Sequence, residues 1–334
     1  MDASISSLLS FVFGSSIPLS AFIAVWVFVL LISLFALIRG SDTFIEGAKQ
    51  MGASLGLSRF AIGVLIVGFG TSLPELATSI SAALKDETAV VIGTTMGSNI
   101  THILFVIGLL TIVGGSVILK QRLLHTGMPI FFIATVHYLF ILKDGYVDRP
   151  EGLLLLGTFA AYVWYLIHEA GVEHDVNVLH SGKKPHLRFR SLTLIILGLI
   201  AIFVGANFAV DMVVNMAIAF AVPLGLVSIA AIGFGAALPE LFVTLQSIRK
   251  KEQELAIGNI FGSHTFNILI TTGAAALITP LVADSVVMEL GIYVFAAASV
   301  IFFVTCMNRQ ILRWEGIMFV LFFAFFLVKL TEFL

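Results

Sequence analysis

Charged residues are scarce in this sequence. Only 11% of its 334 residues are Asp, Glu, Lys or Arg, and 59% are hydrophobic, whereas a soluble domain carries about 25% charged residues. Mean hydropathy is +1.08. There are also only 8 prolines, so long helices can run with few interruptions. This composition excludes an ordinary soluble domain and indicates a polytopic membrane protein.

Cysteine and concentrated basic charge are also lacking. The single cysteine, Cys306, cannot form an intramolecular disulfide, and we interpret it as a core or lipid-facing side chain. The net charge of -2 says nothing about nucleic acid, but the sequence has no basic patch suited to it, so we expect no nucleic-acid partner. The expected partners are therefore the lipid bilayer and small inorganic cations, with no cofactor, and a monomer is compatible with the sequence. Residues 1–17 lack a basic n-region, so we expect no cleavable signal peptide.

Long apolar runs fill most of the chain. A transmembrane helix needs about 20 predominantly apolar residues, and about ten such runs are present. They lie near 18–39, 58–84, 88–114, 121–142, 149–169, 191–215, 222–248, 254–280, 285–306 and 311–332. The one long polar stretch, from His168 to Arg190, separates two groups of five. We predict an N-terminal segment (1–17), a first five-helix repeat (18–169), a cytoplasmic linker (170–190) and a second five-helix repeat (191–334).

The distribution of Lys and Arg predicts the orientation. If the N-terminus is outside, 14 of the 18 Lys and Arg residues lie at inside loops and span ends. Cytoplasmic loops carry such an excess of positive residues. We therefore expect both termini to be extracytoplasmic. The composition indicates an integral protein of a cell membrane, and the short loops suggest a prokaryotic one.

Two stretches of the chain repeat each other. Residues 68–108 and 233–273 align without a gap, with 16 identities in 41 positions, whereas shared membrane composition would give only about 3 or 4. The offset is 165 residues. Because each unit has an odd number of spans, the two copies cross the membrane in opposite directions, which is the inverted-repeat design of secondary transporters.

Each repeat places a proline and a glutamate inside an apolar run. The strings are "GFGTSLPEL", from Gly68, and "GFGAALPEL", from Gly233. The prolines break the helical hydrogen-bond ladder, so we expect the helix to unwind for a few residues. Freed carbonyls, such as those of Thr71 and Ala236, can then bind a cation, since irregular backbone at membrane depth lines a cavity.

Glu75 and Glu240 follow these breaks at mid-span. A lone carboxylate at the bilayer centre costs about 2.5–3.5 kcal/mol, and two carboxylates brought together repel each other. A divalent cation between them relieves both costs. Carboxylate, carbonyl and hydroxyl oxygens are hard-cation ligands suited to Ca²⁺, and two Na⁺ ions or protons are alternative occupants.

A second polar element recurs as "GSNITH" (97–102) and "GSHTFN" (262–267). Ser98 and Ser263 supply hydroxyls, with helix packing beside Gly as the competing interpretation. His102 and Asn267 lie four residues further on, on the same helix face.

These strings resemble the alpha repeats of the cation/calcium antiporter superfamily, and most closely those of prokaryotic sodium/calcium exchangers. "GTSLPE" with "GSN" is the specific part, and "GSDTFIEGA" (40–48), "KDGYVDRPEG" (143–152) and "RWEGI" (313–317) extend the likeness to most of the chain. The resemblance implies a ten-helix fold in which helices 1 and 6 slide across a core of helices 2, 3, 7 and 8.

The resemblance also implies the ion site. The central glutamates of the family fall on Glu75 and Glu240. The other ligand positions fall on Thr71, Ser72, Ser98, Ala236, Ser263, His102 and Asn267.

Five positions depart from the usual family pattern. Ala236 and Ala237 replace a Thr-Ser pair, so a hydroxyl is lost. The family usually has Asn or Asp at the positions of His102 and Asn267, so His102 is unusual and Asn267 lacks the charge of an acid. His264 replaces the Asn of "GSN". One or more Na⁺ sites are then weakened, and coupling to H⁺ becomes an option because histidine titrates near neutral pH. For His102 a satisfied core histidine and a proton carrier are both open, and for His264 packing is favoured.

Several functions are weighed against one another. The leading one is an antiporter that exchanges Ca²⁺ for Na⁺, and the first rival couples Ca²⁺ or another divalent cation to H⁺. A remote rival is an intramembrane metalloenzyme using Glu75, Glu240, His102 and His264, but no nucleophile or zinc-protease spacing accompanies these residues, so we expect no enzyme. Asp42, Glu46 and Asp211 could line an ion vestibule, with interfacial solvation as the default.

Overall fold

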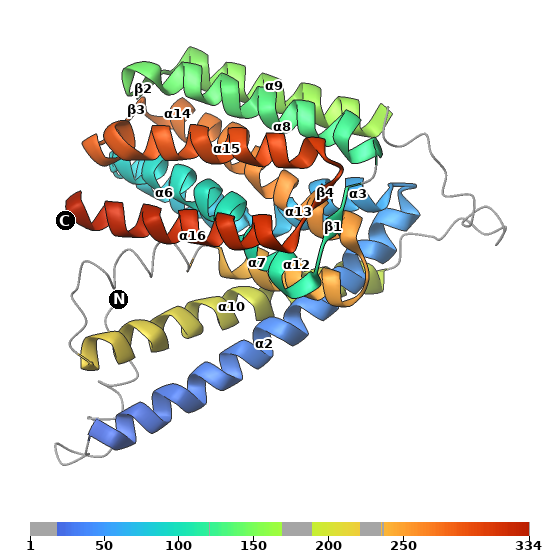
Figure 1. The fold of residues 1–334 in the computed structure, drawn as a ribbon, viewed down its shortest axis with the longest axis vertical. Coiled ribbons are helices and arrows are strands. Elements are labelled where there is room, and N and C mark those ends of the chain that lie inside the picture. The colour runs from blue at the N-terminus through green and yellow to red at the C-terminus, as the bar shows by residue number, and fades with distance from the viewer. Residues whose placement is uncertain (1–18, 120, 169–188, 221–234, 236, 334) are drawn as a thin grey trace, which may run out of the picture.

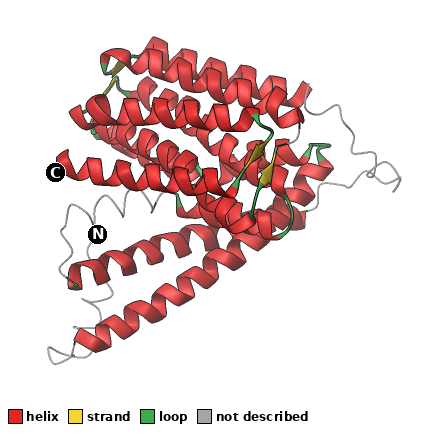
Figure 2. Cartoon of the chain, in the orientation of Figure 1, coloured by secondary structure: helices red, strands yellow, loops and turns green. Residues whose placement is uncertain are grey.

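The computed structural model describes residues 19–119, 121–168, 189–220, 235 and 237–333. Nearly all of this is helix, with two short pairs of strands (Figure 2). Two long helices, α2 and α10, lie together along one flank of the molecule, and the other helices form a larger body beside them (Figure 1). Within the described residues, six helices, or seven with one bent pair, are long and apolar enough to span a membrane.

The part of the chain before the linker contains the helices of the first repeat. Its elements are α2 (Leu19–Ser54), α3 (Arg59–Ile62), η1 (Gly63–Gly68), α4 (Phe69–Thr71), α5 (Leu73–Leu84), α6 (Thr88–Thr101), η2 (His102–Val106), α7 (Ile107–Gly114), β1 (Val117–Ile118), α8 (Gln121–Ile141), η3 (Leu142–Asp144), β2 (Tyr146–Val147) and α9 (Arg149–His168).

The part after the linker follows the same plan. Its elements are α10 (Phe189–Ala219), α12 (Leu238–Arg249), α13 (Gln253–Phe266), η5 (Asn267–Thr271), α14 (Thr272–Ile278), β3 (Leu281–Val282), η6 (Val287–Gly291), α15 (Ile292–Met307), β4 (Gln310–Ile311), α16 (Arg313–Leu330) and η7 (Thr331–Phe333). Each predicted span overlaps a helix, although residues 221–234 of the seventh lie outside the described part, as does most of the predicted linker.

The first helix is longer than predicted. The apolar run ends at Arg39, but α2 continues to Ser54. Charged residues end an apolar run without ending a helix, because the buried face of α2 continues through Phe44, Ile45 and Ala48. That face packs on α10: a Cβ added to Gly40 of α2 would lie 2.9 Å from the Cβ of Ala201 of α10.

The break before Glu75 is shorter than predicted. Only Ser72, with φ -89° and ψ 3°, lies outside a helix, and the chain bends there by 45°. A π-helical segment, η1, precedes it. Pro74 sits at the start of α5, where its missing N–H costs no helical hydrogen bond, so the helix restarts at once instead of staying unwound.

The strand pairs reflect the inverted repeat. β1 pairs with β4 (Val117 with Ile311), and β2 pairs with β3 (Tyr146 with Val282), both antiparallel. An offset of 165 residues brings β1 close to β3 and β2 close to β4, so the repeat relation exchanges the two pairs. They lie toward opposite ends of the molecule (Figure 1), as a two-fold axis across its middle requires.

Candidate functional site

The two Pro-Glu motifs meet at one cavity. Glu75 and Glu240 each lie in the first turn of the helix that follows a break, α5 and α12. A cavity of about 320 Å³ is bordered by residues of both motifs and of α10: Pro74, Glu75, Thr78, Thr94, Phe203, Ala206, Asn207, Val210, Asp211, Gly235 and Pro239. Residues 165 positions apart are thus brought to one place, as the repeat predicts.

Hydroxyl groups next to the first break reach across to the second repeat. Thr71 Oγ1 lies 3.2 Å from Ser263 Oγ, and Ser263 Oγ donates to the Gly68 carbonyl at 3.3 Å. Ser72 Oγ donates to Glu240 Oε1 at 3.5 Å. Four predicted site residues, Thr71, Ser72, Ser263 and Glu240, therefore belong to one buried polar cluster.

Asn259 is a central member of this cluster that the sequence analysis missed. Its side-chain N–H group donates to Thr244 Oγ1 at 2.9 Å and to the Glu240 carbonyl at 3.4 Å, and its Oδ1 accepts from Thr71 at 3.3 Å. The repeat contained a signal, because the counterpart of Asn259 is Thr94, a second polar residue, which lines the cavity.

Close backbone approach makes the cluster possible. α13 packs directly on η1, where a Cβ on Gly262 would lie 2.5 Å from the Val64 carbonyl oxygen. Only glycine fits at that distance. The glycine of "GSH" therefore places Ser263 beside Thr71.

Three of the four carboxylate oxygens of Glu75 and Glu240 have no hydrogen-bond partner in the described part of the chain. Both oxygens of Glu75 and Oε2 of Glu240 are buried and accept no hydrogen bond from the described residues. Buried carboxylates without donors are costly, and a cation supplies the missing charge. With the neighbouring hydroxyls they form a set of oxygen ligands suited to a hard cation.

The remaining predicted ligands lie deeper in the helices. Ser98 Oγ donates to the Thr94 carbonyl at 2.6 Å within α6. His102 and Asn267 are the first residues of the π-helical segments η2 and η5. Both side chains are buried, and their polar atoms have no hydrogen-bond partner among the described residues. None of these three residues lines the cavity.

The other substituted positions are apolar or packed. His264 stacks on Phe131, with ring centroids 3.8 Å apart, and its Nε2 lies 2.9 Å from Thr135 Oγ1. This supports the packing interpretation of His264. Ala237 is buried, and Ala236 lies outside the described residues.

The vestibule candidates divide between the two ends of the molecule. Asp211 lines the cavity. Asp42 is paired with Lys250, and Glu46 accepts a hydrogen bond from Gln50 at 2.9 Å. Within the described residues no three His, Cys, Asp or Glu side chains come together as a transition-metal site, so the cluster offers mainly oxygen ligands.

A family model described as "Sodium/calcium exchanger protein" matches residues 25–168 and 190–331, which is most of both repeats. The chain belongs to this family. Membership confirms the predicted resemblance and makes the protein an all-α polytopic membrane transporter rather than an enzyme.

Relatives of the exchanger family match along nearly their whole length. The putative antiporter CaxA of Alkalimonas amylolytica is 30% identical over 86% of this chain and 92% of its own. The sodium/calcium exchanger MaX1 of Methanosarcina acetivorans is 27% identical over 90% of this chain and 97% of its own. A solved structure of the sodium-calcium exchanger NCX_Mj, soaked with zero Na⁺ and Ca²⁺, is 27% identical, with a TM-score of 0.77 over 92% of this chain and 99% of that one.

These likenesses confirm the predicted fold of two inverted repeats. The exchanger family also makes small cations the substrates of this chain.

Proposed function

We propose that this chain exchanges Ca²⁺ for Na⁺ by alternating access, with Glu75 and Glu240 forming a shared cation site at the membrane midplane. The observation that carries the proposal is the cavity bordered by both Pro-Glu motifs, in which the Glu75 carboxylate has no hydrogen-bond donor among the described residues. Two carboxylates offer a charge of -2, which matches one Ca²⁺ or two Na⁺. Competition for one set of oxygens is sufficient for exchange.

The same proposal assigns the supporting ligands. Thr71, Ser72, Ser98 and Ser263 supply hydroxyls, Ala236 supplies a carbonyl, and His102 and Asn267 supply the two further polar positions. The cluster of Thr71, Ser72, Ser263 and Glu240 supports the first group. Residues 18–169 and 191–334 act as the two repeats, joined by a cytoplasmic linker, with both termini extracytoplasmic and α2 and α10 moving across the other helices.

The test is ⁴⁵Ca²⁺ uptake into proteoliposomes, with an outward Na⁺ gradient in one set and an outward H⁺ gradient in the other. Glu75→Gln and Glu240→Gln each remove one site charge with little change of shape. We expect Na⁺-driven uptake that falls at least about 100-fold in either variant, because an uncompensated cation in a low-dielectric site loses several kcal/mol. No Ca²⁺ uptake under either gradient would contradict the proposal.

H⁺ is the alternative coupling ion, and one observation favours it. His102 is fully buried, and neither of its ring nitrogens has a partner in the described part of the chain. Uptake driven by H⁺ alone, and lost in His102→Asn, would assign the protein to proton-coupled exchange. Uptake driven by Na⁺ in both the parent and His102→Asn would leave His102 a tuning role only.

A further inference from the structure

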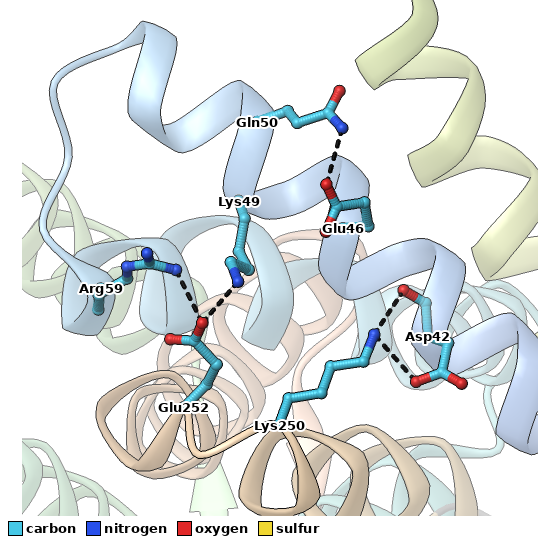
Figure 3. Close-up of polar contacts among 7 residues, drawn as sticks. All are labelled: Asp42, Glu46, Lys49, Gln50, Arg59, Lys250 and Glu252. Atoms are coloured by element: carbon cyan, nitrogen blue, oxygen red, sulfur yellow. Dashed lines mark hydrogen bonds and ion pairs between the residues drawn. The ribbon is translucent and has the colours of Figure 1, made fainter. Parts of the chain in front are cut away.

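Charged side chains of α2, together with Arg59 at the start of α3, contact the turn between α12 and α13 (Figure 3). Lys49 Nζ lies 2.5 Å from Glu252 Oε1, and Arg59 Nη1 lies 3.1 Å from the same oxygen. Lys250 Nζ lies 2.9 Å from Asp42 Oδ1 and also donates to the Asp42 carbonyl at 3.1 Å. We call these five residues, Asp42, Lys49, Arg59, Lys250 and Glu252, the ionic latch.

The latch is shielded more than an ordinary surface ion pair. The Glu252 side chain is 16% exposed and that of Lys49 is 26% exposed, while Asp42 and Lys250 are each 34% exposed. One carboxylate serves two cations, and Lys250 is held by two oxygens of one residue. Shared, partly buried pairs of this kind contribute more than isolated exposed ones.

The repeat has a second turn that resembles the latched one. It joins α5 to α6, and its Lys85 and Glu87 are the counterparts of Lys250 and Glu252, 165 residues earlier. Both turns contain one residue in the left-handed region, Asp86 with φ 59° and Lys251 with φ 61°. The turns therefore share their backbone shape and the outer lysine and glutamate, but the middle residue is acidic in one turn (Asp86) and basic in the other (Lys251).

The two flanking helices are not equivalent in charge. The counterparts on α10 of Asp42 and Lys49 are Asn207 and Val214, which carry none. The Asn207 amide donates to the Phe203 carbonyl of its own helix at 2.9 Å, and the structure shows no ion pair of Lys85 or Glu87 with any described residue. At the positions that match Asp42 and Lys49, α10 therefore has no charge with which to form the same latch at its own turn.

The cavity opens away from the latch. From Glu75 it extends to Thr78, one turn nearer the α5–α6 turn, and to Asp211, on the part of α10 that leads away from the latched end. That end is marked by Ser191, whose hydroxyl donates to Gln50 of α2 at 3.2 Å. The counterpart of Thr78 is Val243, which is fully buried in a cluster with residues of α2. The site is therefore covered on the latched side.

We propose that the ionic latch holds the exchanger in the state in which the site opens toward the α5–α6 turn, and that the opposite state has no matching latch. The proposal rests on the proposed function only in requiring that α2 and α10 move relative to the other helices. The ion pairs then favour one of the two access states, which a symmetric repeat would leave equally populated. An interaction present in one state alone shifts the population toward that state.

The test measures the exposure of two matched positions. In a Cys306→Ser background, Val243→Cys reports the state in which the site opens on the latched side. Thr78→Cys reports the state in which it opens toward the α5–α6 turn. Both react with a membrane-impermeant maleimide in nanodiscs, where the reagent reaches both faces. Glu252→Gln removes the ion pairs of the latch with Lys49 and Arg59. Glu87→Gln is the matched control at the other turn.

With Glu252→Gln we expect labelling of Val243→Cys to accelerate two- to fivefold, about the effect that a partly exposed ion pair can supply. Glu87→Gln should leave the rate unchanged. Asp42→Lys and Lys250→Asp should each accelerate labelling, and the double exchange should return it toward the parent rate.

Three results would overturn the latch. The first is an equal labelling rate of Val243→Cys in Glu252→Gln and Glu87→Gln. The second is faster labelling of both reporter cysteines together, which indicates general loosening of the fold. The third is no labelling of Val243→Cys in any variant. None of these measurements needs Ca²⁺ transport, so failure of the latch and failure of the proposed exchange are distinguishable.

Discussion

Glu75 and Glu240 come from the same motif but occupy different surroundings. Glu75 borders the cavity, and neither of its oxygens has a partner among the described residues. Glu240 is fully buried, accepts a hydrogen bond from Ser72 and lies beside Asn259. An inverted repeat held in one state must expose one copy and cover the other, so this difference reflects the state of the transporter as much as its sequence.

The same contrast extends to the neighbouring residues. Thr94 lines the cavity, whereas its counterpart Asn259 ties three elements together. Asp211 faces the cavity, whereas its counterpart Glu46 is held by Gln50 near the ionic latch. The polar groups of the covered half therefore bond to other residues of the chain, and those of the open half line the cavity.

The largest expected effect comes from the covered half. Gly262→Ala places a methyl group 2.5 Å from the Val64 carbonyl oxygen, and two backbones cannot separate without loss of packing. We expect a cost of about 3 kcal/mol, the upper part of the range for overpacking, measured as a lower melting temperature of the detergent-solubilised protein. Gly157→Ala is the control, because no described atom lies within 4 Å of its added Cβ. Equal melting temperatures for the two variants would contradict the close approach of α13 and η1.

Next in size is the loss of the amide that ties the cluster together. Asn259→Ala leaves the Thr71 and Thr244 hydroxyls without this partner, at a cost of about 1–3 kcal/mol. We expect exchange to fall roughly tenfold, measured as initial ⁴⁵Ca²⁺ flux. Thr94→Ala should change the flux much less, because the Thr94 hydroxyl donates only to carbonyls of its own helix in the described structure. A larger effect of Thr94→Ala would reverse the assignment of covered and open halves.

A smaller effect is expected at the acids outside the site. Asp211→Asn should raise the half-saturating Ca²⁺ concentration roughly two- to threefold at the face toward which the cavity opens, because a carboxylate at the mouth concentrates cations there. The effect should shrink at high salt as charges are screened. Glu46→Gln should act at the opposite face only. Flux measured separately at the two faces checks both variants, and an identical effect at both faces would rule out this division of labour.

The smallest effect sharpens the comparison of the two flanking helices. Asn207→Asp restores on α10 the charge that α2 carries at Asp42, so that Lys85 gains a partner in the opposite state. Labelling of Val243→Cys should rise by at most about twofold, the effect of one exposed pair. The rise should disappear when Lys85→Gln is added. A rise that persists without Lys85 would point to a cause other than a new ion pair.

Much of the fold followed from the sequence, for reasons that are local or periodic. Apolar runs of about 20 residues require helices in a bilayer, and the 165-residue repeat with five spans per copy requires inversion. The sequence also singled out Glu75 and Glu240 as candidate site residues, because an acid inside a membrane span is costly unless it serves a site. The extent of α2 beyond Arg39 did not follow, since hydropathy cannot show that α10 covers the helix there.

The sequence by itself determined that the chain has two related halves. It also showed where a helix is interrupted in each half and which glutamate each half contributes to the candidate site. Only the tertiary structure decided which half is covered, that Asn259 joins the Thr71 and Glu240 cluster, and that Asp42 and Lys49 meet the α12–α13 turn. The physical reason is that the repeated sequence sets the order of helices and motifs within each copy, whereas the conformational state of the transporter sets the contacts between the copies. Residues equivalent in sequence therefore differ in burial and in partners.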